Sequence, residues 1–253
     1  MVSCKTEKKK DAIDNRAHHT SEANIASKEM RKADTLIAET IKAHGGGLYE
    51  TAFYGFTFRD KYFTFENNGG SYTYTMSLIE HGDKLRYTLK NGKFTHTKNG
   101  AVTELSAKDV AKYTEDVNSV VYFATLPYKL NDNAVNKSYG GNTTIKGQNY
   151  DVIAVDFDQK GGGIDYEDKF MYWINSETKT LDYLAYSYET NVGGVRFRSA
   201  YNPRTIDGIR FQDYINYEVA KGTPLKDISA LYEKGELKEL SRIDTEDIVN
   251  LKK

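Results

Sequence analysis

Five acidic side chains surround a run of glycines and could, by residue type, bind a metal ion. They are Asp156, Asp158, Asp165, Glu167 and Asp168, on either side of Gly161 to Gly163. Carboxylates in a glycine-rich loop can hold calcium, but the EF-hand loop needs a regular ligand spacing and a bidentate Glu at its twelfth position. That spacing is missing, so the region 156–168 is predicted to be a solvated acidic loop, with no metal and no cofactor.

A nucleophile activated by a base would need a Ser or Cys close to a His. The sequence has no Gly-x-Ser-x-Gly elbow, and its single cysteine, Cys4, lies near the start of the chain. His44, His81 and His96 lack metal-ligand spacing. We therefore expect no enzyme activity. A hydrolase that uses carboxylates of the acidic loop is kept as an alternative, because paired acids can also cleave bonds.

Two arginines, Arg196 and Arg198, alternate along one predicted strand and therefore point to the same face. The guanidinium group suits bidentate binding of carboxylate or phosphate. One interpretation is an exposed strand face with ion pairs to Glu189 or Asp213. The other is a contact with a ligand headgroup at the mouth of a cavity.

Composition limits the class of protein. The chain has 35 basic and 36 acidic residues, and this balance predicts no nucleic-acid partner. Aromatic residues reach 13%, with 20 Tyr and 11 Phe, and both types favour strands. One cysteine excludes an internal disulfide, and no apolar run has the length of a membrane-spanning helix. We expect a monomer.

Residues Met1 to Cys4 resemble the end of a bacterial lipobox, and a polar, lysine-rich segment follows them. In that motif the Cys thiol carries lipid, which implies a membrane anchor on Cys4 and a place in the bacterial cell envelope, on the periplasmic or outer surface of the outer membrane. The apolar segment that precedes a lipobox is missing, as expected for a truncated or mis-started chain. We expect residues 1–27 to form this remnant and a flexible tether, and residues 28–253 to form one domain.

Two helices are predicted from periodicity and capping. Apolar residues recur at helical spacing over residues 28–44, before Gly45. A second helix begins after Ser106, whose spacing to Asp109 fits a capping box, and ends near Phe123, ahead of Pro127.

Alternating apolar residues elsewhere predict antiparallel strands. One series covers residues 52–100, with Asn-Gly pairs at hairpin turns, and a second covers residues 143–219. A short helix over 224–233 and a last strand over 237–243 follow. The chain is therefore predicted to be mainly β (α+β), with a curved antiparallel sheet that forms an unclosed half-barrel and helices packed on its concave face.

Two stretches resemble LolA- and LolB-type bacterial lipoprotein carriers. They are the helix from Ala33 to Gly46, before aromatic strands, and the strands around Phe157 and Phe170 to Asn175, which include Trp173 and Ile174. The resemblance implies a cavity for acyl chains between sheet and helices. It predicts a cell-envelope lipoprotein that binds a lipid or an acylated ligand without catalysis.

Candidate cavity-wall residues are the large apolar side chains of the alternating strands. These are Phe56, Phe58, Tyr74, Met76, Tyr87, Leu89, Phe157, Trp173 and Tyr186. Each could instead fill a closed core, since alternation does not separate a core from a cavity. A surface module that binds glycan or protein through a Tyr-rich face is a further alternative.

Overall fold

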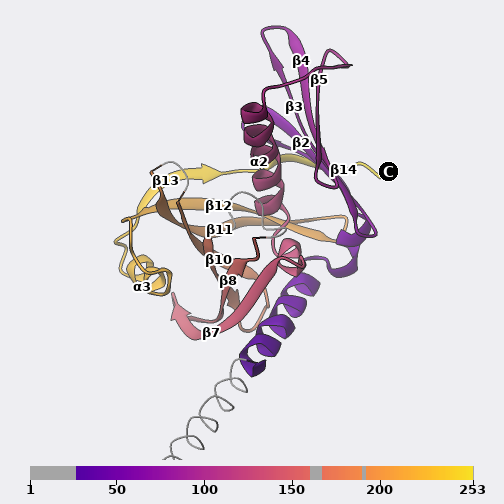
Figure 1. Cartoon of the computed structure of the whole chain (residues 1–253). Helices are drawn as coiled ribbons and strands as arrows, with labels where there is room; N and C mark the ends of the chain where they lie inside the picture. Colours follow the sequence, from indigo (N-terminus) through magenta and orange to yellow (C-terminus); the bar gives the residue numbers. More distant parts are fainter. Residues whose placement is uncertain (1–26, 160–166, 190–191, 253) are drawn as a thin grey trace, which may run out of the picture.

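Two antiparallel sheets of seven strands each make up most of the chain in the computed structural model (Figure 1). The structure describes residues 27–159, 167–189 and 192–252. Cys4, Gly161 to Gly163 and Asp165 lie outside these residues.

The first sheet has the strand order β14-β1-β2-β3-β4-β5-β6. Its strands are β1 (Phe53–Phe58), β2 (Lys61–Asn68), β3 (Ser71–Glu80), β4 (Asp83–Lys90), β5 (Lys93–Lys98), β6 (Ala101–Val102) and β14 (Glu246–Asn250). The second sheet has the order β13-β12-β11-β10-β9-β8-β7. Its strands are β7 (Val135–Ile145), β8 (Gln148–Phe157), β9 (Lys169–Asn175), β10 (Leu181–Tyr188), β11 (Gly194–Ile206), β12 (Ile209–Val219) and β13 (Lys238–Ile243).

The last two strands connect the sheets. β13 ends the second sheet at Ile243, two residues follow, and β14 then pairs with β1 at one edge of the first sheet. Figure 1 shows this yellow segment passing from one sheet to the other. At the opposite edges, β6 and β7 do not pair with each other in the described part of the chain. The predicted unclosed half-barrel is therefore confirmed, with its sheet divided in two.

Both longer helices pack on inner faces, as predicted. The helix over residues 27–44 contributes Leu36 and Ile37 to a core against the second sheet. Helix α2 (Ala107–Ala124) contributes Val117 and Val121 to a core against the first sheet. Ser106 caps α2, since its hydroxyl accepts a hydrogen bond from the Asp109 amide. No helix among the described residues is long and apolar enough to cross a bilayer.

A third helix covers the other face of the second sheet. It is α3 (Ile228–Glu233), preceded by the 3-10 turn η3 (Leu225–Asp227). Ile228 packs in one cluster with Trp173 and Phe197, whereas the neighbouring Tyr172 belongs to the inner core. Because side chains alternate along a strand, the second sheet has a covered outer face as well as a covered inner one.

Two parts of the sheet differ from the sequence-based expectation. β7 begins at Val135 rather than at residue 143, and the turn to β8 lies at Lys146 and Gly147. β7 is an edge strand with alternating half-exposed polar residues, so its sequence lacks an apolar pattern. β14 is also missing from the prediction, since only Ile248 and Val249 are apolar within it.

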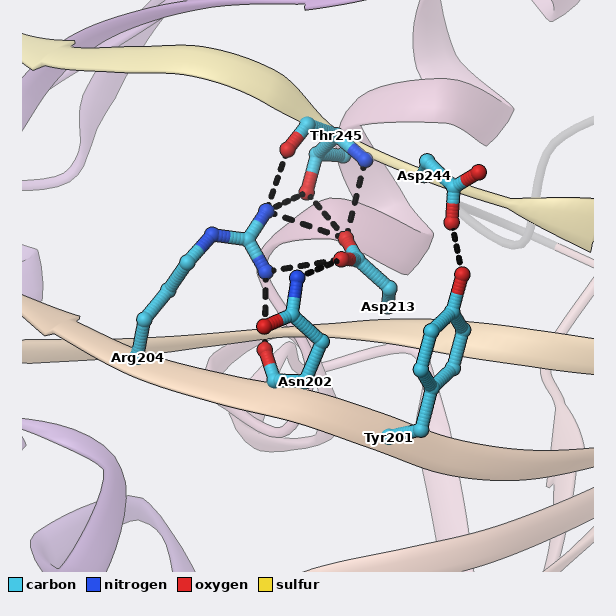
Figure 2. Close-up of polar contacts among 6 residues, drawn as sticks. All are labelled: Tyr201, Asn202, Arg204, Asp213, Asp244 and Thr245. Atoms are coloured by element: carbon cyan, nitrogen blue, oxygen red, sulfur yellow. Dashed lines mark hydrogen bonds and ion pairs between the residues drawn. The ribbon is translucent and has the colours of Figure 1, made fainter.

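A buried carboxylate fixes the crossing between the sheets (Figure 2). Asp213 on β12 is 2% exposed and forms a bidentate ion pair with Arg204 of β11, at 2.9 and 3.0 Å. Asn202 donates to the same carboxylate at 2.7 Å. The backbone amide and hydroxyl of Thr245, between β13 and β14, donate to it at 2.9 and 3.0 Å.

The same cluster uses a bulge in β11. The register of β11 against β12 shifts between Tyr201 and Arg204, and Asn202 has a φ of 47°. At this bulge the side chains of Asn202 and Arg204 both turn toward Asp213. Arg204 also donates to the carbonyl and the hydroxyl of Thr245, and Tyr201 donates to Asp244. The crossing segment 244–245 is thus held by charged and neutral hydrogen bonds at once.

The end of the first helix is anchored on the second sheet. His44 is fully buried, and its Nε2 accepts a hydrogen bond from the Leu181 amide at 3.1 Å. Gly45 follows with a φ of 135°, and a Cβ there would lie 3.1 Å from the Gly208 carbonyl oxygen, so glycine permits this close contact. Burial, assisted by the charge of Arg210, lowers the pKa of His44 from 6.5 to about 3.

This pKa predicts a loss of stability in acid. Between pH 6.5 and 3 the unfolded chain binds a proton at His44 and the folded chain does not, so the free energy of unfolding falls as pH falls. The contribution of His44 is on the order of 5 kcal/mol across this window. Urea unfolding from pH 8 to pH 3.5 should show a shallower pH dependence for His44→Gln than for wild type. His81→Gln, at an exposed turn, should keep the wild-type slope; equal slopes for His44→Gln and wild type would contradict the assignment.

The Asp213 cluster predicts a large effect of a small substitution. Asp213→Asn removes the charge that Arg204 and Thr245 share, and breaking a buried ion pair typically lowers the free energy of unfolding by about 3 kcal/mol. Asp116→Asn makes the same chemical change in an exposed pair with Lys112, where the loss should be below about 0.5 kcal/mol. Denaturant unfolding of both variants measures the difference; similar small losses would show that the cluster does not hold the crossing.

Candidate functional site

A cavity of about 790 Å³ lies between α2, the inner face of the second sheet and part of the first sheet. Helix α2 contributes one side through residues from Thr114 to Ala124. Strands β8 to β13 contribute the other side, and Thr245 of the crossing segment also lines it. The volume falls in the range of about 300–1,000 Å³ that small-molecule sites occupy.

An aromatic wall forms one part of the cavity. We define it as Tyr122 and Phe123 of α2, Phe157 of β8, Phe170 of β9 and Tyr186 of β10. Phe170 is its centre: its ring stacks on Tyr186 at 5.3 Å and meets Phe157 edge-on at 5.5 Å. These ring contacts hold the aromatic faces in place, so this wall offers a mainly apolar surface to a ligand.

A buried arginine lies beside the aromatic wall. Arg198 is 8% exposed, and its guanidinium carbon lies 3.8 Å from the centre of the Phe123 ring. Its Nη2 donates to the Tyr186 hydroxyl at 2.9 Å, whereas its buried Nε has no hydrogen-bond partner. An unpaired buried donor costs about 1–3 kcal/mol, and the ring contacts offset part of this cost.

Two unpaired acceptors belong to the same cavity. The side-chain oxygens of Gln212 and Asn216, both on β12, are buried and have no hydrogen-bond partner. Asn216 lies opposite Arg198 in the register of β11 and β12, and its amide nitrogen donates to Ser241 at 3.3 Å. Between the two acceptors, burial raises the pKa of Tyr214 to about 12, so this phenol stays neutral.

A second cation lines the cavity on the side of the first sheet. Lys129, in the 3-10 turn η2 (Tyr128–Asn131), lies 3.2 Å from the Asp132 carboxylate and 5.1 Å from the centre of the Tyr74 ring. Burial alone lowers the pKa of Lys129, but Tyr74 and Asp132 outweigh burial and raise it. Lys129 is therefore charged at neutral pH and already has a counter-charge.

The nine candidate wall residues divide into two groups. Phe58, Leu89, Phe157 and Tyr186 line the cavity. Five others lie in closed cores: Phe56, Tyr74, Met76 and Tyr87 pack between the first sheet and α2, and Trp173 packs under α3. The valines of α2 fill the space above the first sheet, and Trp173 points to the outer face.

The arginine pair does not form the ion pairs that were considered for it. Arg196 and Arg198 both line the cavity, and neither contacts Glu189 or Asp213 through an ion pair among the described residues. Asp213 is occupied by Arg204 instead. Arg196 is half-buried and donates to the carbonyl of Val195 at 2.9 Å.

The acidic loop shows no assembled metal site in the part that the structure describes. Asp156 and Asp158 are exposed, and Asp158 accepts a hydrogen bond from Asn136 at 2.9 Å. Asp168 is buried and lines the cavity. Across residues 27–159, 167–189 and 192–252, no three His, Cys, Asp or Glu side chains come close enough to share a metal ion.

Sequence reasoning missed several residues of the cavity, most of all Phe123, Phe170, Tyr214 and Asn216. β9 has large apolar residues on both faces because both faces are covered, so alternation does not reveal that Phe170 points inward. The pairing of β8 with β9 would have indicated Phe170. It lies opposite Val155, which shares a strand face with Phe157.

Comparison with solved structures identifies the fold. A LolA superfamily protein from Nitrosomonas europaea has a TM-score of 0.50 and 12% identity, with 85% of this chain and 92% of that chain covered. A DUF1329 family protein from Desulfovibrio piger has a TM-score of 0.42 and 9% identity, with coverage of 88% and 93%. The resemblance to LolA-type proteins is confirmed at the level of the fold. No curated protein sequence shows significant similarity to the chain.

Comparison with family models identifies the relatives. The model described as "Family of unknown function (DUF6503)" matches residues 6–245, which is nearly the whole chain. The chain therefore belongs to the DUF6503 family and has a LolA-like fold.

Proposed function

We propose that this protein is a cell-envelope lipoprotein that binds a hydrophobic or amphipathic ligand, a lipid or an acyl chain, in its cavity without catalysis. The observation that carries the proposal is the cavity of about 790 Å³ beside the aromatic wall. Burying about 300 Å² of apolar ligand surface there would contribute roughly 7 kcal/mol before the entropic cost of association. The proposed contacts are Phe58, Leu89, Phe157 and Tyr186, joined by Phe123 and Phe170.

The distribution of tyrosines argues for the interior of the molecule as the binding surface. Eight tyrosines are buried: Tyr49, Tyr54, Tyr74, Tyr87, Tyr150, Tyr172, Tyr183 and Tyr214. Among the described tyrosines, Tyr62 is the exposed one, with 37% of its surface accessible. Eight of the 20 tyrosines thus belong to the buried cores, which favours the interior over a Tyr-rich outer face as the binding surface.

Filling the cavity should abolish binding. Native mass spectrometry of the freshly purified chain should show extra mass that extracts into organic solvent. Ser119→Trp places a large ring in the cavity from α2 and should lower ligand occupancy at least about tenfold. Ala111→Trp adds the same ring on an exposed part of α2 and should keep wild-type occupancy. A wild-type mass without ligand, unchanged after incubation with a phosphatidylethanolamine–phosphatidylglycerol extract, would contradict the proposal.

The anchor rests on the sequence around Cys4 and is tested separately. Expression of the complete gene in its bacterial host with labelled palmitate should label the wild-type protein and place it in the membrane fraction. Cys4→Ser should remove the label and release the protein, because no acyl chains remain to hold it. Wild-type protein in the membrane fraction with an unmodified Cys4 thiol would exclude the anchor while leaving the cavity proposal intact.

A further inference from the structure

Arg198 is a buried cation of the cavity, and no ion pair neutralises it within the described residues. Within the described ranges, Arg198 has no ion pair with a carboxylate, and Asp132 of the cavity lining is not its partner. Asp132 pairs with Lys129 instead. Burying a charge without a counter-charge is strongly unfavourable, so a bound ligand that supplies a negative charge would stabilise Arg198.

The hydrogen bonds of Arg198 are equally incomplete. The guanidinium has five N–H donors, and the one hydrogen bond that it makes within the described part of the chain goes from Nη2 to the Tyr186 hydroxyl. Its Nε is enclosed and unpaired, and Nη1 has no hydrogen-bond partner among the described residues. Phe123 and Tyr186 hold the guanidinium plane in place, with 3.8 and 5.2 Å from its carbon to the two ring centres. A carboxylate or phosphate fits this fixed set of unpaired donors best, because two of its oxygens can accept hydrogen bonds in parallel.

The residue opposite Arg198 adds a second requirement. Asn216 is 8% exposed, is the register partner of Arg198 on β12, and has an unpaired side-chain oxygen. Gln212 lies on the same face of β12, four residues before Asn216, and its side-chain oxygen is also unpaired. These oxygens accept hydrogen bonds and repel a bare anion, so the headgroup beside Arg198 also needs an N–H or O–H donor.

We propose that the ligand is an acidic amphiphile, whose carboxylate or phosphate is bound by Arg198, whose neighbouring amide or hydroxyl donates to Asn216, and whose acyl chain lies on the aromatic wall. This inference rests on the proposed function and specifies its ligand class. Half-buried Arg196 lies two residues before Arg198 on the same face and lines the same cavity, so it adds positive potential without being the anchor.

The test compares two ligands that differ only in the acid. Isothermal titration of the delipidated full chain uses N-oleoylglycine, which has an amide and a carboxylate, and N-oleoylethanolamine, which has the same amide and chain but ends in an alcohol. Wild type should bind N-oleoylglycine at least about tenfold more tightly. Arg198→Met should lose this preference and bind the alcohol as well as wild type does, and Arg198→Lys should keep part of the preference. Arg86→Met, at an exposed position of β4 outside the cavity, should behave as wild type.

The other outcomes separate this inference from the proposed function. Equal affinity of wild type for both ligands, or an undiminished preference in Arg198→Met, would overturn the acid anchor and leave lipid binding standing. Failure of both ligands to bind would overturn both proposals. Competition of inorganic phosphate or acetate with N-oleoylglycine at similar concentrations would overturn the amphiphile as ligand, since a small anion alone would then fill the site. Unchanged thermal unfolding of Arg198→Met would exclude misfolding as the cause of a lost preference.

Discussion

The half-barrel depends on one buried charge at the place where its two sheets meet. Asp213 gathers Arg204, Asn202 and Thr245 around a single carboxylate, and two of these partners come from the β11 bulge while the third belongs to the crossing segment. Without this centre, residues 244 and 245 would be an ordinary short connection. With it, the end of the second sheet is fixed against the start of the first, and the inner faces of both sheets turn toward α2.

The inner faces of the two sheets are covered to different extents. On the first sheet, the valines of α2 complete a closed aromatic core around Phe63, Phe65 and Met76. On the second sheet, the helix over residues 27–44 covers β8 to β10 only in part, and the remaining surface between Phe170, Tyr186 and Asn216 stays open as the cavity. The division explains why a protein with one continuous pattern of inward aromatic residues has both a filled core and an unfilled space.

The architecture followed from the sequence where a local signal and the tertiary structure agree. Ser106 and Pro127 bracket α2 within a residue or two, and the Asn-Gly pairs place hairpins of the first sheet correctly. The prediction failed where only pairing decides the structure. β7 and β14 are strands because β8 and β1 offer hydrogen-bond partners, and their polar sequences alone do not encode that. The cavity was predictable as a kind of site but not residue by residue. Phe170 and Trp173 are both large aromatic residues of β9, and only the face of the strand separates the one that lines the cavity from the one that does not.

In the described part of the chain, the two sheets join at one side only, and this has a consequence for how such a fold diversifies. Within each sheet, backbone hydrogen bonds set the spacing of strands, whereas across the cavity side chains of α2 and of both sheets set the distance. Exchanging a residue such as Ser119 or Ile243 therefore alters the volume and shape of the interior without disturbing a single ladder bond. A few substitutions can accordingly reshape the interior of this scaffold, while the backbone ladders of both sheets stay intact.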